Sequence, residues 1–136
     1  MKRRDFILSG SALTLLPAAV SASTGIAYNP GLVEKELAAG KTVFLDFYTS
    51  WCTTCASQGR TIEALRAADP AYDEAITFIS IDWDIHSDAP ISRSLNIPRR
   101  STLVVLKGDK ELGRIVAGTR NAEIKALLDT ALAASA

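Results

Sequence analysis

Residues 47–55 read FYTSWCTTC and contain both cysteines of the 136-residue chain, Cys52 and Cys55. The stretch just before them, Thr42–Tyr48 (TVFLDFY), is nearly continuous in β-branched and aromatic residues, which is typical of a strand buried on both faces. The residues from Cys52 to about Ala68 are predicted to form a helix. The cysteine pair is therefore expected at the junction of a buried strand and a helix.

The position of Cys52 at the start of this helix favours its thiolate form. Unpaired backbone N–H groups and the helix dipole stabilise negative charge there. Such a position lowers the pKa of a thiol from about 8.5 to between about 3.5 and 7.5. Cys55 follows one turn later, close enough to attack a mixed disulfide on Cys52 and release the partner. We expect Cys52 to be the nucleophile and Cys55 the resolving thiol of a redox pair.

Three other uses of the two cysteines remain open. A structural disulfide between them would close a very short loop and stabilise the fold little, because the gain grows with loop length. A zinc site needs four ligands, and the chain adds only one histidine, His86. A Cu(I) site of Cys52, Cys55 and His86 is chemically possible because soft thiolates select Cu(I). The alternative function is therefore a Cu(I)-binding metallochaperone, although the polar loop around His86 (WDIHSDA) also suits a solvated surface residue.

The rest of the chain alternates between helical and strand patterns. Helices are expected at residues 32–39, 88–96 and 121–133, and strands at 75–82, 102–106 and 112–117, with a hairpin turn at 107–110. We expect Asp88 and Asn121 to cap their helices and Gly40 to end the first one in the left-handed region. Helices between the early strands predict parallel crossovers, and the hairpin adds an antiparallel edge. The predicted fold is α/β, a mixed sheet of about four strands with helices on both faces, preceded by a leader or irregular first strand.

The N-terminal residues predict an export signal. A basic cluster, Lys2–Arg4, precedes a mostly apolar run, Phe6–Val20, that is too short to cross a bilayer comfortably. The small residues of Val20–Ala22 suit a signal-peptidase site. We expect a signal peptide over residues 1–22, cleaved near Ala22, ahead of one domain over residues 23–136 that resides in the periplasm.

The basic cluster and the residues just after it also resemble a particular class of export signal. The stretch Arg3–Ile7 (RRDFI) is similar to the twin-arginine export signal. The match is partial, because Lys2 stands where Ser or Thr is usual and no Lys follows Ile7. General secretion is therefore the alternative route.

Composition limits the classes of partner. The chain has 15 basic and 15 acidic residues, a formal net charge of zero, which argues against nucleic acid or an acidic membrane surface as a partner. Its length and its 48% hydrophobic content fit one globular domain with a core. We expect a monomer with no cofactor besides the redox-active pair of cysteines.

Two stretches resemble one known family. Val43–Cys55 (VFLDFYTSWCTTC) is similar to the active-site strand and loop of the thioredoxin family, and Ser101–Gly108 (STLVVLKG) to a later strand of that family. The resemblance covers residues 32–132. It is closest to small periplasmic thioredoxins and to the C-terminal domain of DsbD-type transmembrane reductases.

This resemblance implies a thioredoxin-like fold and a thiol–disulfide oxidoreductase that reduces disulfides of periplasmic proteins. It also implies a membrane electron donor of the DsbD or CcdA type. Within the same class, the rival is an oxidase that donates its own disulfide. The two differ in the direction in which electrons flow through the cysteine pair.

Two further site residues follow from the resemblance. Asp46 corresponds to the family's buried acid behind the cysteines, and Trp51 is expected to pack over the disulfide and form part of the docking surface. Asp46 is also a lone carboxylate in an apolar strand, so burial should raise its pKa and make it a general base for the proton of Cys55. The alternative is an Asp exposed at the end of the strand.

One loop departs from the family pattern. The family places a cis-proline at the position of Ser101, where a cis bond would cost about 2.5–4 kcal/mol without proline. Either the fold holds that bond or the loop Ile97–Thr102 takes another path, and the serine hydroxyl could approach the sulfurs. We expect Arg100, Ser101 and Thr102 to contribute to docking. If Arg99 and Arg100 face the cysteines, their charges favour the thiolate and attract an acidic partner.

Overall fold

The computed structural model describes residues 25–136, so the predicted signal peptide over residues 1–22 lies outside the described part. The elements follow one another as β1 (Ile26–Ala27), α1 (Leu32–Ala38), β2 (Thr42–Tyr48), α2 (Thr53–Ala68), α3 (Ala71–Ala75), β3 (Ile76–Asp82), α4 (Trp83–His86), α5 (Pro90–Ser94), β4 (Thr102–Lys107), β5 (Lys110–Val116) and α6 (Asn121–Ala134).

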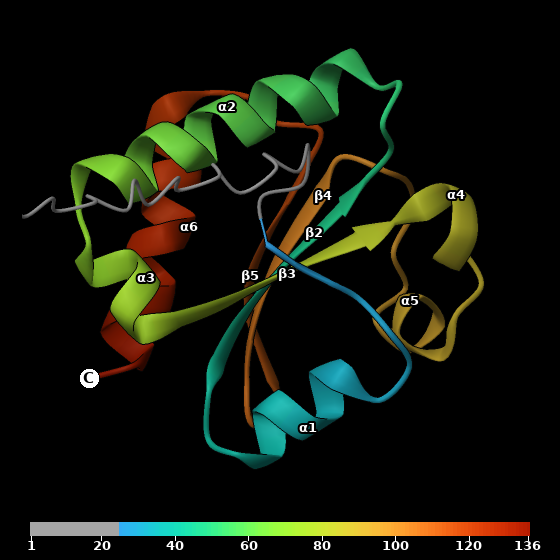
Figure 1. The fold of residues 1–136 in the computed structure, drawn as a ribbon, viewed down its shortest axis with the longest axis horizontal. Helices are drawn as coiled ribbons and strands as arrows, with labels where there is room; N and C mark the ends of the chain where they lie inside the picture. The colour runs from blue at the N-terminus through green and yellow to red at the C-terminus, as the bar shows by residue number, and fades with distance from the viewer. Residues whose placement is uncertain (1–24) are drawn as a thin grey trace, which may run out of the picture.

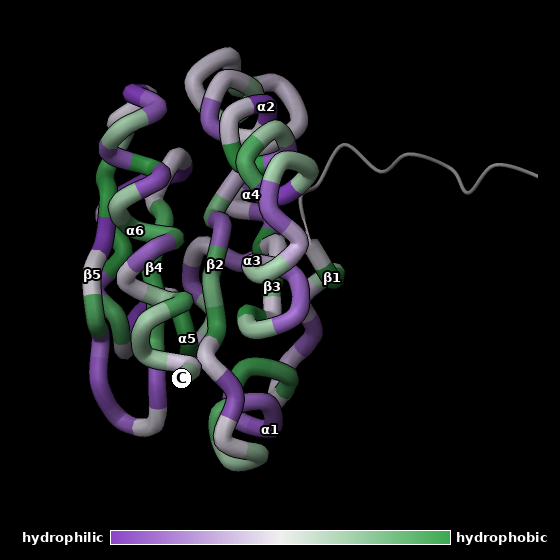
Figure 2. The backbone as a smooth tube through the Cα atoms, turned by 90° about the vertical axis from the view of Figure 1, so that its left-hand side faces the viewer, coloured by the Kyte–Doolittle hydropathy of each residue, from purple (hydrophilic) through white to green (hydrophobic). Residues whose placement is uncertain are grey.

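The strands form one mixed sheet in the order β1-β3-β2-β4-β5. β3 runs parallel to both β1 and β2, whereas β4 is antiparallel to β2 and β5 is antiparallel to β4. Helices α2, α3 and α6 cover one face, and α1 and α5 cover the other (Figure 1). Figure 2 shows the same strand order after a quarter turn. The predicted α/β sandwich of helices around a mixed sheet is therefore confirmed.

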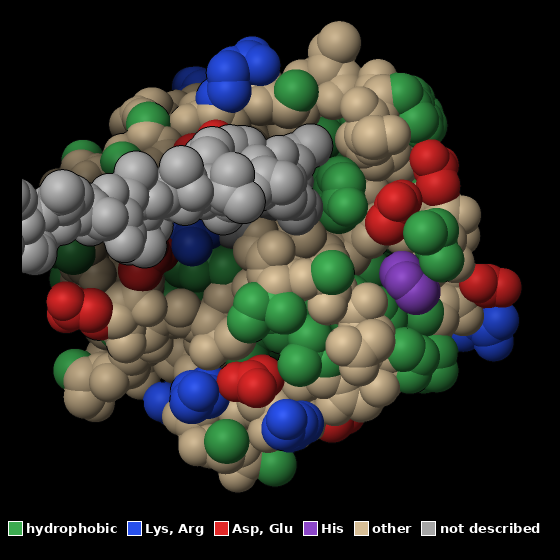
Figure 3. All heavy atoms as spheres, in the orientation of Figure 1, with side chains coloured by type: hydrophobic (Ala, Val, Ile, Leu, Met, Phe, Trp, Pro, Cys, Tyr) green, Lys and Arg blue, Asp and Glu red, His purple; other side chains and the backbone are tan. Residues whose placement is uncertain are grey.

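On the face shown in Figure 3, acidic and basic side chains are interspersed and form no broad patch of one sign. Among residues 25–136, no helix is both long enough and apolar enough to cross a membrane.

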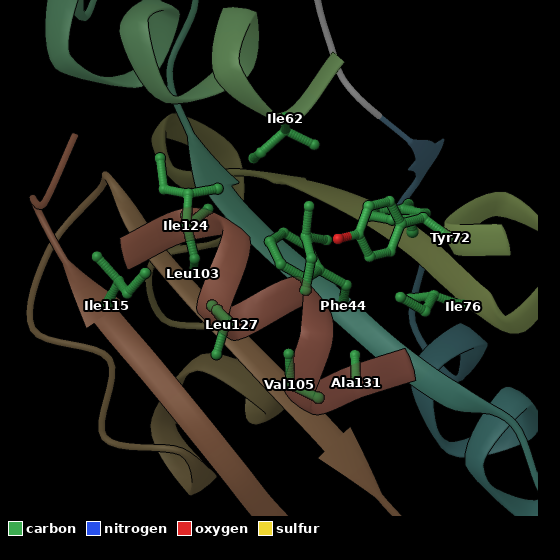
Figure 4. Close-up of a cluster of buried hydrophobic side chains, with 12 residues drawn as sticks. Phe44, Ile62, Tyr72, Ile76, Leu103, Val105, Ile115, Ile124, Leu127 and Ala131 are labelled. Atoms are coloured by element: carbon green, nitrogen blue, oxygen red, sulfur yellow. The ribbon is translucent and has the colours of Figure 1, made fainter. Parts of the chain in front are cut away.

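The alternation of β2 divides the core into two clusters. Phe44 packs on the face that α2, α3 and α6 cover, together with Ile62 and Leu128 (Figure 4 shows most of this cluster). Val43 and Leu45 belong to the second cluster, on the side of α1 and α5. Side chains two residues apart in a strand share a face. Residue 46 of β2 therefore lies on the same face as Phe44, under α2.

Two details of the sheet differ from the prediction. The sheet has five strands, because the two residues of β1 pair with β3 beyond the four that were predicted. The connection into β4 is not a parallel crossover. It contains only the short helices α4 and α5, of four and five residues, and Thr102 enters opposite Phe47, near the end of β2, so that β4 runs antiparallel to β2.

Local signals were confirmed in part. Gly40 has φ +84° after α1, and residues 107–110 join β4 to β5 as a hairpin. The predicted caps were wrong: the residue before α5 is Ala89 and the residue before α6 is Arg120, and neither side chain caps its helix.

Asp88 and the loop before it also differ from the prediction. Asp88 forms an exposed ion pair with Arg93 instead of capping α5. The loop predicted around His86 contains α4, which begins there because the carboxylate of Asp82 accepts a hydrogen bond from the Asp84 N–H.

Candidate active site

The two cysteines lie where β2 passes into α2. Cys52 is the residue before the first helical residue and has an extended backbone, and its sulfur accepts a hydrogen bond of 3.1 Å from the Cys55 N–H. Each cysteine is 5% exposed. The two sulfurs are not joined by a disulfide, so the structure shows the dithiol. The predicted strand–helix junction is confirmed, with the Cys52 sulfur in the capping position of α2.

The surroundings of the two thiols move their pKa values in opposite directions. Burial by itself raises the pKa of Cys52, but hydrogen bonds from Cys55, Ser101 and Arg100 outweigh burial and lower that pKa to about 6. Burial raises the pKa of Cys55, and its hydrogen bond to Cys52 raises it further. At neutral pH, Cys52 is therefore mostly thiolate and Cys55 is a thiol.

The Ser101 hydroxyl lies between the two sulfurs. Its Oγ is 3.3 Å from the sulfur of Cys52 and 3.0 Å from that of Cys55, and the side chain is fully buried. Both distances suit hydrogen bonds to sulfur. One hydroxyl therefore touches both reacting atoms, as the sequence had suggested it could.

The loop that presents Ser101 takes the second of the two predicted paths. Residues 25–136 contain no cis peptide bond, and Ser101 instead has φ +66°. Its N–H donates a 2.7 Å hydrogen bond to the Phe47 carbonyl oxygen, and its own carbonyl oxygen accepts from Ala117. A proline has neither the N–H nor access to positive φ. This backbone is therefore incompatible with the proline that the family pattern calls for.

Gln58 is a site residue that the sequence analysis missed. It is fully buried on α2, and its Nε2 donates to the carbonyl oxygens of Ser101 at 3.0 Å and of Gly118 at 2.9 Å. The available signal was a polar residue one turn after Cys55 and one turn before Ile62, on the buried side of the helix. Gln58 ties the Ser101 loop to the helix that bears the cysteines.

Asp46 and Thr102 are both buried. Asp46 is 4% exposed and lies on the α2 face of β2, so the alternative of an exposed Asp at the strand end is wrong. Thr102 is fully buried, and its Oγ1 donates to the Arg99 carbonyl oxygen at 2.8 Å. Thr102 therefore braces the loop from inside and offers no side-chain surface to solvent.

Trp51 and Arg100 form the solvent-facing rim beside Cys52. Trp51 is 60% exposed, and its indole Nε1 donates to Asp84 at 2.8 Å. The Arg100 guanidinium stacks over the Trp51 ring, 4.3 Å from its centroid. Of the two arginines, Arg100 contributes to the low pKa of Cys52, whereas Arg99 Nε donates to the Arg100 carbonyl oxygen. The sequence analysis did not find Asp84.

His86 does not join the cysteines. It lies in α4, and its ring contacts the ring of Tyr28 edge-on, with centroids 4.8 Å apart. Within the described part of the chain, no three His, Cys, Asp or Glu side chains come together as a metal site. The described residues therefore do not bring together the three predicted Cu(I) ligands, Cys52, Cys55 and His86.

Comparison with known proteins identifies the family to which the chain belongs. The sequence model of the thioredoxin family matches residues 27–130. The chain belongs to the thioredoxin family. It is similar to thioredoxin-2 of Saccharomyces cerevisiae, with 34% identity over 93 residues, 68% of this chain and 83% of that protein. It is also similar to a thioredoxin of Mycolicibacterium smegmatis, with 25% identity over 96 residues, 71% of this chain and 83% of that protein.

Solved structures of thioredoxins share the fold. Trxlp from Edwardsiella tarda superposes with a TM-score of 0.65 at 24% identity, covering 76% of this chain and 98% of that one. The thioredoxin of Malassezia sympodialis gives 0.62 at 20% identity, covering 79% and 94%. As a thioredoxin-family protein, the chain is a thiol–disulfide oxidoreductase that uses the Cys52/Cys55 pair and acts on protein thiols and disulfides.

Proposed function

We propose that this thioredoxin-family protein is exported to the periplasm and reduces disulfides of partner proteins there. The observation that carries the thiol–disulfide exchange chemistry is the unequal state of the two thiols, because the pKa of Cys52 is lowered to about 6 whereas that of Cys55 is raised. In a dithiol of this kind, one cysteine is a thiolate that can attack a disulfide, and the other stays protonated until it resolves the mixed disulfide.

The reaction has two steps. The Cys52 thiolate attacks one sulfur of the partner disulfide, which forms a mixed disulfide and expels the other partner sulfur as a thiolate. Cys55 then gives its proton to Asp46, the buried general base, and attacks the Cys52 sulfur. The second partner sulfur leaves, and the Cys52–Cys55 disulfide remains. Two electrons have passed from the dithiol to the partner.

The partner docks on the rim beside Cys52. The exposed ring of Trp51 provides an apolar surface, and Arg100 stacked on it adds a positive charge that favours an acidic segment. Ser101 lies at the sulfurs, and Thr102 contributes indirectly by holding the loop in place.

The export proposal rests on the N-terminal sequence, a basic cluster followed by an apolar run and small residues near Ala22. The periplasm is kept oxidising, so a reductase there needs a continuous source of electrons. We therefore include in the proposal a membrane electron donor of the DsbD or CcdA type that reduces the Cys52–Cys55 disulfide after each turnover.

Trapping of partners tests the function directly. A Cys55→Ala variant expressed in the native host should accumulate partner proteins as mixed disulfides on Cys52, because the resolving thiol is gone. The matched Cys52→Ala variant, in which only Cys55 remains, should trap far less. Absence of periplasmic adducts from the first variant, or equal trapping by both, would contradict the proposal.

The direction of electron flow has its own test. The reduction potential of the Cys52–Cys55 pair should lie nearer to the roughly −270 mV of thioredoxin than to the roughly −120 mV of the oxidase DsbA. Equilibration with glutathione buffers measures it. A value near that of DsbA would assign the protein to disulfide donation instead of reduction.

A further inference from the structure

The Ser101 hydroxyl is placed to contact both reacting sulfurs without any movement of the loop. Its Oγ lies 3.3 Å from the Cys52 sulfur and 3.0 Å from the Cys55 sulfur, at a fully buried position. A serine hydroxyl has a single proton to donate, and that proton moves between acceptors when the O–H bond rotates. The hydroxyl can therefore donate to either sulfur, one at a time.

The negative charge changes sulfur during the reaction. In the reduced enzyme the charge resides on Cys52, whose lowered pKa owes part of its shift to Ser101. In the mixed disulfide the Cys52 sulfur is uncharged, and charge must form on Cys55 as its proton leaves. Cys55 is buried, which raises its pKa and makes that charge costly, while the Ser101 hydrogen bond lowers the same pKa.

We propose that the Ser101 hydroxyl is a catalytic group in both half-reactions, donating first to the Cys52 thiolate and then to the Cys55 thiolate as the charge moves. The proposal rests on the roles of Cys52 and Cys55 given above. No proton is transferred to or from Ser101, because its O–H bond only rotates. The Cys55 proton still goes to the general base, and the electrons still pass to the partner.

Gln58 is the residue that positions this hydroxyl. Its amide nitrogen donates to the Ser101 carbonyl oxygen at 3.0 Å, and the Ser101 N–H is held by the Phe47 carbonyl oxygen at 2.7 Å. The two bonds fix the peptide units on both sides of a residue with φ +66°. Gln58 lies on the same helix as Cys55, so it sets the distance between the hydroxyl and the sulfurs.

The test measures each half-reaction as a function of pH in the Ser101→Ala and Ser101→Gly variants. Glycine adopts positive φ freely, so Ser101→Gly removes the hydroxyl without backbone strain. The first readout is the pH profile of Cys52 alkylation by iodoacetamide. The second is the release of an aromatic thiol from a mixed disulfide preformed on Cys52. Both profiles should move to higher pH by about one unit in both variants.

The outcomes separate the inference from the function on which it rests. If only the Cys52 profile moves, or if neither moves, the hydroxyl does not serve both sulfurs and the inference is overturned. If the protein with Ser101 intact forms no mixed disulfide on Cys52, the proposed roles of the cysteines fail instead. Circular dichroism of each variant verifies that it is folded.

A double-mutant cycle tests the positioning role. Gln58→Leu should shift the pH profile of Cys52 alkylation to higher pH when Ser101 is present. In the Ser101→Gly background it should cause no further shift. Ile62→Val, one turn further along α2 in the apolar cluster, is the matched control and should leave the profile in place. Equal shifts from Gln58→Leu in both backgrounds would mean that Gln58 does not act through the hydroxyl.

Discussion

The sheet face under α2 has two halves that differ in chemistry. In one half, the buried side chains are apolar, with Phe44 of β2 packed against Ile62 of α2. In the other half, polar side chains are buried: Asp46 of β2, Gln58 of α2, and Ser101, whose hydroxyl contacts both sulfurs. Phe44 and Asp46 are only two positions apart on one strand, so the change from core to active site takes place within a single step of the strand.

The two halves contribute differently to stability. A fully buried apolar side chain of this size stabilises a fold by about 1.5–3 kcal/mol. A buried polar group costs free energy unless it is hydrogen-bonded, and Gln58 and Ser101 are held by backbone partners. The apolar half therefore provides stability that offsets the cost of burying polar groups in the other half. Substitutions in the two halves should therefore affect different observables.

The largest effect is expected in the apolar half. Phe44→Ala should lower the free energy of unfolding by about 3–5 kcal/mol, because it removes a buried ring and leaves a cavity. Urea denaturation measures the loss, and the pH profile of Cys52 alkylation should not move. Ile62→Val, with an expected loss of about 0.5–1.5 kcal/mol, provides a milder substitution in the same cluster. A shifted profile in the folded Ile62→Val protein would show that the halves are coupled.

The next largest effect is expected in the polar half. Asp46→Asn should slow release of the partner from the mixed disulfide by about 100-fold, the lower end of what a general base contributes. The first attack by Cys52 should be nearly unaffected, and the free energy of unfolding should not fall, since a neutral amide is less costly to bury than a carboxylate. Rapid-quench kinetics of both steps provide the measurement. Equal slowing of both steps would argue against a role specific to Cys55.

A smaller effect is expected at the rim. Arg100→Ala should raise the pKa of Cys52 by about half a unit, because it removes one of several hydrogen-bond donors. Arg99→Ala is the matched control and should leave that pKa unchanged, since its side chain bonds the Arg100 carbonyl oxygen instead. Iodoacetamide alkylation as a function of pH distinguishes them. The assignment to Arg100 fails if the two variants behave alike.

The last expected effect is a dependence of stability on pH. The pKa of Cys52 is lowered on folding to about 6, well below that of an ordinary thiol. The thiolate therefore stabilises the reduced fold fully above the unfolded pKa, and this contribution is lost as the pH falls toward 6. Urea midpoints of the reduced protein, relative to the oxidised protein, should rise between pH 6 and 8. A constant difference would contradict the low pKa.

The sequence predicted the elements whose signal is local and strong. The buried strand before Cys52, the helix after it and the hairpin at residues 107–110 follow from apolar runs and turn residues. The pairing of β1 and the direction of β4 depend on contacts between distant segments, which a local pattern does not contain. The predicted cap at Asp88 was wrong because its carboxylate pairs with Arg93 instead.

The residues of the candidate site were likewise predicted only in part. Cys52, Cys55 and Asp46 could be found from their spacing and from the strand that holds them. The path of the Ser101 loop could not, because serine at positive φ has no sequence signature and is held by Phe47 and Gln58 from elsewhere in the fold. The position of His86 could not be predicted for the same reason, since its ring packs against Tyr28 from a distant part of the sequence.

The central claim, an activated Cys52 backed by a protonated Cys55, is tested most directly by alkylation of each cysteine in the reduced protein as a function of pH. Mass spectrometry of the peptides assigns the label to each residue. Cys52 should be half-reactive near pH 6, whereas Cys55 should react only above the range of an ordinary thiol. Titration of both cysteines together near pH 9, or of Cys55 before Cys52, would contradict the account.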